Sequence, residues 1–281
     1  MDHFDQFAAY ETAKKKSALT VSAYTTDILE FMYYIKKDAL EIAQKDIGRY
    51  VEYLKTCKNQ KGVLFSIKTI NRKMVSINRF ILYLNDMHGM QILAKAPVFK
   101  IQQQNYLDDV ISKSDFDRIV RAADKKNDTR AKAIFYTLYY TGMRVSEMLQ
   151  LQLEDVEKET INVRGKGDKY RDVFISDKLK ALWNEYRKDR RDNSKMFFTG
   201  ERGPITRQTA SSIIKYYAGQ ARVKLTKAHA HSFRHLFCLT LVEKGMSIDT
   251  VADLAGHSNI NTTRIYTRKT KKQLLAAINE M

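Results

Sequence analysis

The amino-acid sequence predicts a mostly α-helical protein with a small β-sheet, divided into two domains. The 281 residues include only two prolines and 11 glycines, a composition that favours helices. Apolar residues recur every three or four positions through most of the chain, as on one face of a helix. Strict alternation of apolar and polar residues marks one stretch, from Glu159 to Ser176, and indicates a β-hairpin.

The first half is expected to form a helical domain over residues 1–95. Helical periodicity covers three segments, which are residues 19–37, 46–59 and 66–89. Asp46 is a possible N-cap of the second segment, and Gly89 ends the third as a C-cap would. Residues 96–111 are predicted to be a linker, because this region contains Pro97 and several glutamines and has no clean period.

The second domain is expected over residues 112–281. It begins where Ser112 or Ser114 can cap a helix, and an apolar helix follows that ends at Gly142. The hairpin comes next, with apolar positions on both sides of a "GKGD" tip, and "KMFFT" is a possible short strand. Further helices are expected over residues 177–191, 206–222, 231–244 and 247–255, and from residue 262 onward.

The charge of the chain indicates a polyanionic partner. Lysine and arginine number 49 against 32 aspartates and glutamates, so the formal charge is +17. Such an excess destabilises a compact chain by self-repulsion, and nucleic acid is the usual partner that neutralises it. Three basic residues of the first domain are candidate phosphate contacts, or an ordinary solvated helix face: Lys68, Arg72 and Lys73.

Nothing in the sequence indicates secretion or a membrane. Cys57 and Cys238 both lie in helical patterns, and a chain of this length needs no disulfide, so a reducing cytoplasm is expected. No run of 18 apolar residues occurs, and the N-terminus lacks the apolar core of a signal peptide.

Two motifs of the second domain carry pairs of residues suited to an anionic substrate. In "TGMRVSEML", Arg144 follows a glycine, and Glu147 lies three residues later, where it can face the arginine. In "AHAHSFRHLF", His231 and Arg234 are three residues apart and therefore share one helix face. Each pair alone is equally compatible with an ordinary polar surface.

The histidine-rich motif raises the question of a metal site. His231 and His235 have the spacing of zinc-binding helices, and His229 is near, but "HSFRH" lacks the glutamate that follows the first histidine in such helices. No pair of carboxylates suited to Mg²⁺ stands out either. No metal or other cofactor is therefore expected.

Two further stretches contain candidate residues. The glycine-flanked hairpin tip carries Lys166 and Lys169, with Arg164 on the strand before it. The stretch "LAGHSNINTTRIYT" places His257 nine residues before Tyr266, among many hydrogen-bonding side chains. The chain has 16 tyrosines, so it is this company, and not the residue type, that distinguishes Tyr266.

Taken together, these motifs resemble the signature of the tyrosine recombinases, the family of phage integrases and Xer-type resolvases. The similar stretches are "TGMRVSE", "GKG", "HSFRH", "GHS" and "TTRIYT". The resemblance is strong from about Ser112 to Met281, whereas the first domain is similar to the family's core-binding domain in type only. Phe233 stands where leucine is common and Ala255 precedes "GHS", but neither departure falls on a catalytic position.

The resemblance implies a helical core-binding domain followed by a tyrosine-recombinase catalytic domain. It implies a site-specific recombinase or integrase that forms a 3′-phosphotyrosyl intermediate and exchanges strands through a Holliday junction. Six residues would be catalytic: Arg144, Lys166, His231, Arg234, His257 and Tyr266. Tyr266 would be the nucleophile, Lys166 the acid for the departing 5′ oxygen, and Glu147 would orient Arg144. DNA contacts are expected from Lys68, Arg72, Lys73, Arg164 and Lys169.

These residue types suit the chemistry. Guanidinium forks can hold the oxygens of a phosphodiester as their charge grows in the transition state. A tyrosine, whose ordinary pKa is about 10, needs such cationic surroundings to react. The phosphotyrosyl ester then conserves the energy of the broken bond for rejoining.

Double-stranded DNA is the expected partner, and the bacterial nucleoid the expected place of action. A homotetramer on two DNA sites is expected, with a C-terminal helix over residues 271–281 docking on the neighbouring protomer. About 18 residues precede the first expected helix, so either the enzyme lacks the arm-binding domain that many integrases carry, or the sequence begins downstream of it. Three other functions stay open: a type IB topoisomerase, a non-catalytic basic DNA-binding protein and a metal-dependent nuclease.

Overall fold

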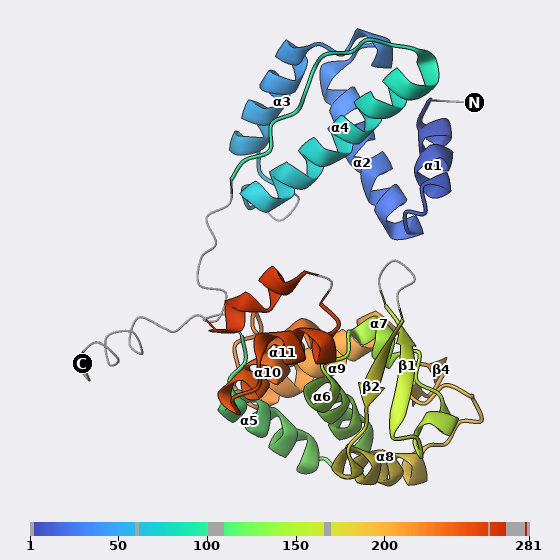
Figure 1. The fold of residues 1–281 in the computed structure, drawn as a ribbon, viewed down its shortest axis with the longest axis vertical. Helices are drawn as coiled ribbons and strands as arrows, with labels where there is room; N and C mark the ends of the chain where they lie inside the picture. Colours follow the sequence, from blue (N-terminus) through green and yellow to red (C-terminus); the bar gives the residue numbers. More distant parts are fainter. Residues whose placement is uncertain are drawn as a thin grey trace. The chain divides into compact units, whose positions relative to one another are not determined.

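The computed structural model describes residues 3–59, 62–100, 110–165, 170–257, 259–267 and 279. The chain divides into two compact units, Met1–Gln103 and Gln104–Met281, and each is described here by itself (Figure 1). Helices dominate both units, and the strands within the described residues form two small two-stranded sheets, both in the second unit. The predicted fold class is therefore confirmed. The predicted linker crosses residues 101–109, which lie outside the described part, so the domain limits stay a prediction.

Unit 1 is a helical bundle around an apolar core. Its elements are α1 (His3–Ala13), α2 (Ala18–Ile35), η1 (Ala39–Glu41), α3 (Gln44–Thr56) and α4 (Ile67–His88). Ser17 and Ser66 cap α2 and α4, since each side chain accepts a hydrogen bond from a backbone N–H of the first turn. Gly89 ends α4 in the left-handed region, at φ 61°, as its position in the sequence predicted.

Two details of unit 1 differ from the prediction. Residues before Leu19 form the helix α1. Its two fully buried side chains are Phe7, which packs against Phe80 and Tyr83, and Glu11, an acidic residue that a search for apolar periodicity does not count. Asp46 is not an N-cap. It lies in the first turn of α3, where its carboxylate accepts a hydrogen bond from the backbone N–H of Ala43, the residue that precedes the helix.

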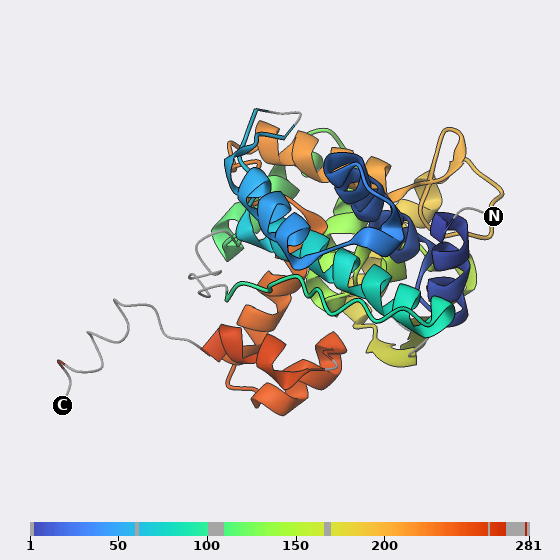
Figure 2. The same ribbon diagram turned by 90° about the horizontal axis from the view of Figure 1, so that it is seen from above.

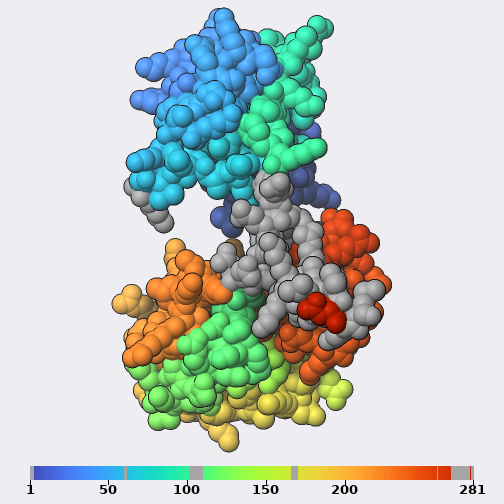
Figure 3. Space-filling model, turned by 90° about the vertical axis from the view of Figure 1, so that its left-hand side faces the viewer, coloured from blue at the N-terminus to red at the C-terminus, as the bar shows by residue number. Residues whose placement is uncertain are grey.

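Four amide side chains hold the segment after α4 along the bundle. Each amide both donates to and accepts from the backbone of one residue, at 2.8–3.2 Å. The pairs are Asn71 with Phe99, Asn78 with Ala96, Asn85 with Ile92, and Gln44 with Lys95. The three asparagines are spaced by seven residues and so share one face of α4. Figure 3 shows the green atoms of this segment lying directly on the helices of unit 1.

Unit 2 packs helices around a larger core and two small sheets. Its helices are α5 (Lys113–Asp124), α6 (Thr129–Thr141), α7 (Val145–Met148), η3 (Leu153–Asp155), α8 (Asp177–Asp189), α9 (Arg207–Gln220), α10 (Ala230–Glu243), α11 (Ile248–Ala255), η4 (Ile260–Thr262) and η5 (Arg264–Thr267). Its strands are β1 (Thr160–Arg164), β2 (Tyr170–Phe174), β3 (Thr199–Gly200) and β4 (Gly203–Pro204). The core includes Trp183, Phe135 and Phe233, all fully buried.

The local signals read from the sequence define most elements of unit 2. Of the two candidate caps of α5, it is Ser112 that accepts from the Asp115 backbone N–H, at 3.0 Å. The predicted hairpin is β1 paired antiparallel with β2, with Ile161 opposite Val173. The helix expected from residue 262 onward is instead a pair of short 3-10 turns, η4 and η5, as far as Thr267. None of the helices described here is long and apolar enough to cross a bilayer.

A second, smaller apolar cluster joins α10 to the last described segments of unit 2. It contains Phe237, Cys238, Val251, Ala255 and Tyr266. Figures 1 and 2 both show α11 and the red segment after it beside α10. The residues singled out in the sequence around Arg234, His257 and Tyr266 therefore belong to one corner of the fold.

Candidate active site

The turn between α6 and α7 places Arg144. Gly142 ends α6 at φ 57°, and a Cβ at this position would lie 2.4 Å from the Phe237 ring of α10, so only glycine allows the two segments to approach this closely. Arg144 then precedes α7. Its backbone N–H donates to Glu147 Oε2 at 3.0 Å, and its Nη1 pairs with Oε1 at 2.7 Å. The contact expected from their spacing is thus present.

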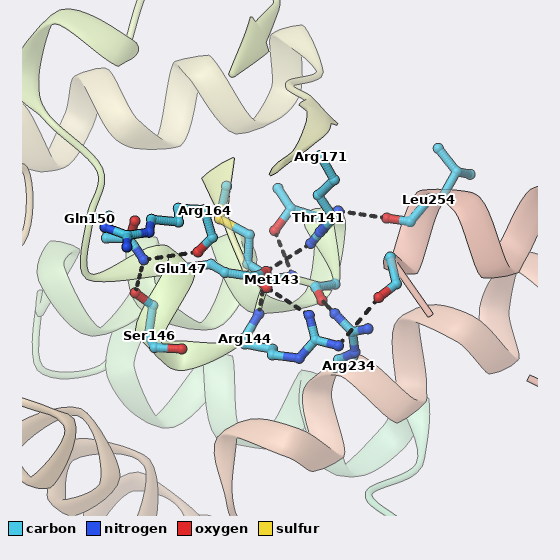
Figure 4. A network of polar contacts seen from close by, with 12 residues as sticks. Thr141, Met143, Arg144, Ser146, Glu147, Gln150, Arg164, Arg171, Arg234 and Leu254 are labelled. Atoms are coloured by element: carbon cyan, nitrogen blue, oxygen red, sulfur yellow. Dashed lines mark hydrogen bonds and ion pairs between the residues drawn. The ribbon is translucent and has the colours of Figure 1, made fainter. Parts of the chain in front are cut away.

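Glu147 is fully buried and also pairs with a second arginine, Arg171 of β2 (Figure 4). Arg171 Nη2 lies 3.0 Å from Oε2, and its Nη1 donates to the Leu254 carbonyl oxygen at 2.7 Å. Burial alone would raise the pKa of Glu147, but the attraction of Arg171 and the hydrogen bonds from Arg144 and Arg171 outweigh it and lower the pKa. Glu147 is therefore an anion that joins α7 to the hairpin.

The loop after α11 is held by the same two arginines. Arg144 Nη2 donates to the Gly256 carbonyl oxygen at 3.3 Å, close to the contact of Arg171 with Leu254. Gly256 has φ +65°, and a Cβ there would lie 2.3 Å from Arg171 Cδ. The glycine is thus required both for the backbone conformation and for the approach of Arg171. The next residue is His257, so the network positions it.

Arg234 is 1% exposed. Its Nη1 donates to the Gly142 carbonyl oxygen at 2.7 Å, whereas its buried Nε and Nη2 have no hydrogen-bond partner among the residues that the structure describes. Burial, and then the positive charges of Arg144 and Arg171, lower its pKa to about 10. Arg234 is therefore a buried cation with unpaired N–H donors, an arrangement suited to binding an anion.

The rings of His257 and Tyr266 are nearly parallel and stacked. Their ring centroids are 6.4 Å apart with an angle of 14° between the planes, and His257 Nδ1 is 2.9 Å from Thr263 Oγ1. Burial, and then the charges of Arg234 and Arg144, lower the pKa of His257 to about 4. The imidazole is thus neutral at pH 7 in the free protein.

The hydroxyl of Tyr266 contacts a histidine that the sequence had not assigned to it. Tyr266 is 4% exposed, and its Oη lies 2.6 Å from His235 Nδ1. Burial, and then contact with Cys238, raise the pKa of Tyr266 above its usual range. His231, by contrast, is exposed on the same face of α10, with its ring centroid 4.3 Å from that of His235.

The structure thus brings Arg144, Glu147, Arg234, His257 and Tyr266 into one region, with His231 at its edge. Lys166 and Lys169 lie outside the described residues, as does the expected terminal helix apart from Asn279. Within the described part, no group of three or more histidine, cysteine, aspartate or glutamate side chains is arranged to hold a metal ion. His235 is close to His231, but it contacts the tyrosine.

Sequence reasoning missed Arg171, although a signal was present. Arg171 lies opposite Val163 in the register of the hairpin, and Val163 is 3% exposed. Directly opposed residues of an antiparallel pair point to the same face. An arginine at an inward position of a strand needs a buried partner, and that partner is Glu147.

Comparison with known proteins identifies the family. The sequence profile described as Phage integrase family matches residues 109–273, and that described as Phage integrase, N-terminal SAM-like domain, matches residues 4–87. The chain belongs to the phage integrase family. The resemblance to tyrosine recombinases, and the prediction that the chain is an enzyme of this kind, are confirmed.

Relatives of this integrase-family chain match it along nearly its whole length. A protein named TnP I resolvase from Bacillus thuringiensis is 30% identical, over 98% of both chains. Tyrosine recombinase XerA from Pyrococcus horikoshii is 29% identical, over 99% of this chain and 93% of its own. A XerH site-specific recombinase, solved as a post-cleavage complex with a difH substrate, has the same fold, with a TM-score of 0.74 at 21% identity over 95% of this chain and 81% of its own.

The basic residues expected to contact DNA in unit 1 of this integrase differ in their surroundings. Lys68 is exposed, and Arg72 is partly exposed while pairing with Asp27. Lys73 is only 2% exposed, and its ammonium pairs with Asp27, at 3.2 Å, and with Glu30. This corrects the assignment of Lys73 to a DNA-binding surface, because a buried, paired ammonium cannot reach a phosphate.

Arg164 of unit 2 ends β1 with its side chain exposed. Its backbone carbonyl oxygen accepts a hydrogen bond from Gln150 Nε2 at 3.3 Å, which ties the end of β1 to the segment after α7. A DNA contact by this side chain stays a prediction.

Proposed function

We propose that this enzyme cuts and rejoins DNA at specific sites by forming a 3′-phosphotyrosyl intermediate on Tyr266. The XerH recombinase structure that shares the fold contains its DNA substrate, which supports a DNA substrate for this chain. The formal charge of +17 supports the same partner. We extend the proposal to strand exchange through a Holliday junction by four protomers.

The cationic cluster around Arg234 is the observation that carries the proposal. Arg144 and Arg171 pair with the single carboxylate of Glu147, whereas the nearby Arg234 donates only to the Gly142 carbonyl oxygen among the described residues. Buried donors without partners are costly, and sites of this kind are arranged for an anionic ligand. A phosphodiester carries one negative charge on two free oxygens, and a guanidinium fork matches that geometry.

The proposed first step is a displacement at phosphorus, in which Tyr266 replaces the 5′ oxygen. Tyr266 Oη attacks the scissile phosphorus and forms a P–O bond, while its proton passes to His231 or His257. Arg144 and Arg234 hold the equatorial oxygens, whose negative charge grows in the transition state. The bond to the 5′ oxygen breaks, and Lys166 supplies the proton that this oxygen needs. Attack by a 5′ hydroxyl on the phosphotyrosyl ester reverses the step and releases Tyr266.

A trapping experiment tests this proposal against the nuclease and binding-protein alternatives. The substrate is a nicked duplex that carries the binding site selected with this protein from a random-sequence pool. We expect SDS to trap a protein–DNA adduct joined at the 3′ phosphate, at the same yield with 5 mM EDTA as with ~5 mM Mg²⁺. Cleavage that requires Mg²⁺ and leaves no adduct would assign the protein to the nucleases. Relaxation of supercoiled DNA that lacks the selected site would favour the topoisomerase alternative.

The choice of Lys166 over Lys169 as general acid gives a second prediction. Gly165 and Gly167 flank Lys166 in the sequence and allow a close approach of the backbone to DNA. We expect Lys166→Ala to slow single-turnover cleavage by about 10²-fold or more. A 5′-bridging phosphorothiolate, whose sulfur leaves without a proton, should restore most of this loss. Lys169→Ala is the matched control, and rescue of that variant instead would exchange the two roles.

The surroundings of Lys68 and Lys73 give a third prediction, because only one of the two is exposed. Lys68→Gln should reduce the slope of log K against log salt by about 1 if it contacts a phosphate. Lys73→Met should leave this slope unchanged but lower the free energy of unfolding by about 1–3 kcal/mol, because the buried Asp27 loses one charged partner and keeps Arg72 and Ser76. Titrations at four salt concentrations and urea unfolding measure the two effects. An equal change of slope in both variants would contradict this division.

A further inference from the structure

The nucleophile proposed above is bound, in the free protein, to a residue outside the proposed catalytic set. Tyr266 Oη is 2.6 Å from His235 Nδ1, and the two ring centroids are 5.5 Å apart. Cys238, three residues further along α10, belongs to the same buried cluster as Tyr266. Tyr266 is thus seated in the small apolar cluster with its hydroxyl directed at α10.

The charges around this pair keep the phenol protonated. Burial is the main cause that lowers the pKa of His235 to about 3, and unfavourable interactions with the neighbouring histidines and with the Arg234 cation lower it further. Burial raises the pKa of Tyr266. The phenol O–H therefore donates to an unprotonated Nδ1, and the ring proton of His235 is on Nε2. A neutral phenol held in this way is a poor nucleophile.

Neither reacting group is open to a phosphate in this conformation. Tyr266 is 4% and Arg234 1% exposed, and the unpaired Nε and Nη2 of Arg234 have no solvent access. A DNA phosphate can reach them only after a local movement.

Helix α10 offers a second histidine to which the hydroxyl can move. His231 lies four residues before His235, on the same face of α10, and their rings meet edge to face at 4.3 Å. His235 is half-buried, whereas His231 is exposed. The face thus has an inner and an outer imidazole, about one helical turn apart.

The segment that carries Tyr266 is suited to such a movement. Between Ile260 and Thr267 it consists of two short 3-10 turns, η4 and η5. Hydrogen bonds in 3-10 turns have poorer geometry than those in α-helices, so such turns are held less firmly than a helix of the same length. The contact of His257 with Thr263, at 2.9 Å, links the same segment to the loop that Arg144 and Arg171 hold.

We propose that His235 stores the hydroxyl of Tyr266 while no DNA is bound, and that Tyr266 moves outward along α10 to His231 when a phosphodiester enters the site. The inference rests on the proposed role of Tyr266 as nucleophile. His235 is then a positioning residue that withholds the nucleophile from reaction. A bound phosphate favours the outward state if that state alone brings the hydroxyl to its phosphorus, because a ligand shifts an equilibrium toward the conformation with which it interacts more strongly.

The first measurement needs no cleavage and so tests storage separately from the proposed function. The complete chain is prepared with 3-fluorotyrosine at position 266, and its ¹⁹F resonance is recorded without DNA and with the selected duplex. We expect the DNA-free resonance of His235→Phe, which keeps a ring but has no acceptor, to move toward the DNA-bound position. His235→Asn, whose Oδ1 can replace Nδ1 as acceptor, should keep the original resonance. Identical DNA-free resonances in all three proteins would overturn the proposal.

The second measurement is the rate of covalent capture on the nicked duplex under single-turnover conditions. Loss of one buried hydrogen bond that stabilises the stored state should make capture about three- to tenfold faster in His235→Phe. His231→Phe should lose capture yet keep the DNA-free ¹⁹F resonance. A hundredfold loss of capture in His235→Phe, with unchanged DNA affinity, would instead place His235 in the chemistry and reject storage. Should His235→Phe not fold, ¹⁵N-histidine spectra of the wild type and Tyr266→Phe replace it, and an unchanged His235 Nδ1 resonance would reject the contact.

Discussion

We expect covalent capture of a nicked duplex to fall below detection, by about 10⁴-fold or more, when Tyr266 is replaced by phenylalanine. The substitution removes only the phenol oxygen, which is the atom that forms the bond to phosphorus. The ring stays in the cluster with Val251 and Ala255. DNA affinity should therefore change by less than about twofold, because the cations that hold the phosphates are untouched.

The matched control is Tyr217→Phe. Tyr217 is also a buried tyrosine of unit 2, and its hydroxyl donates to Asp128 Oδ2 at 2.8 Å, so this variant loses a comparable hydrogen bond away from the cluster. It should capture DNA at the wild-type rate. SDS trapping with labelled duplex measures capture, and a gel-shift titration measures affinity. An undiminished adduct in Tyr266→Phe would move the nucleophile to another residue and remove the basis of the proposed function.

Local signals made the elements of the fold predictable. Capping by Ser112, the left-handed glycines 89 and 142, and the alternation of the hairpin each act over a few residues, and the structure reproduces them. The helix α1 was missed because its stability comes from Phe7 packing on residues of α4, a contact about 70 positions away in sequence. Tertiary contacts of this kind leave no periodic trace.

The candidate site was predictable where the motifs were contiguous and unpredictable where partners come from distant segments. The Arg144–Glu147 contact follows from a spacing of three. The contact of Arg171 with Glu147 arises because Arg171 is on the inward face of β2. The contact of His235 with Tyr266 arises because α10 packs against η5. Lys73 was wrongly interpreted as a surface cation because it is a basic residue on a helix. Its side chain is buried and pairs with Asp27, a residue of another helix.

The buried and partly buried cations of the two units differ in whether a carboxylate compensates their charge, and this difference decides their effect on stability. Lys73 and Arg79 of unit 1 each face carboxylates that compensate their charge, and Arg79 makes three contacts of 2.6–3.0 Å with Glu11. Within the described part of the chain, Arg234 makes no ion pair with a carboxylate. Lowering its pKa from 12.5 to about 10 means that the fold disfavours its charged form by about 3 kcal/mol. Because the folded pKa of this base is depressed, the penalty is fully present at every pH below about 10.

Replacing Arg234 with methionine should therefore separate stability from activity. Single-turnover cleavage should slow by about 10²–10³-fold or more, because a guanidinium that stabilises the transition-state oxygens is lost. The free energy of unfolding should stay the same or rise by up to about 2 kcal/mol, since the charge penalty disappears while one hydrogen bond, to the Gly142 carbonyl oxygen, is lost.

The same substitution at Arg79 is the control with the opposite sign. Arg79→Met leaves the fully buried carboxylate of Glu11 without its partner and should lower the free energy of unfolding by about 3–5 kcal/mol. Urea unfolding at pH 7 compares the two variants, and cleavage is followed where both are folded. A loss of more than about 2 kcal/mol in Arg234→Met would show that partners in the free protein already compensate this guanidinium. The cluster would then be a structural ion network, and its free donors could no longer be assigned to a phosphate. A variant that is stable and inactive would support the opposite conclusion. The uncompensated charge of Arg234 would then lower the stability of the free protein and serve to bind the phosphodiester.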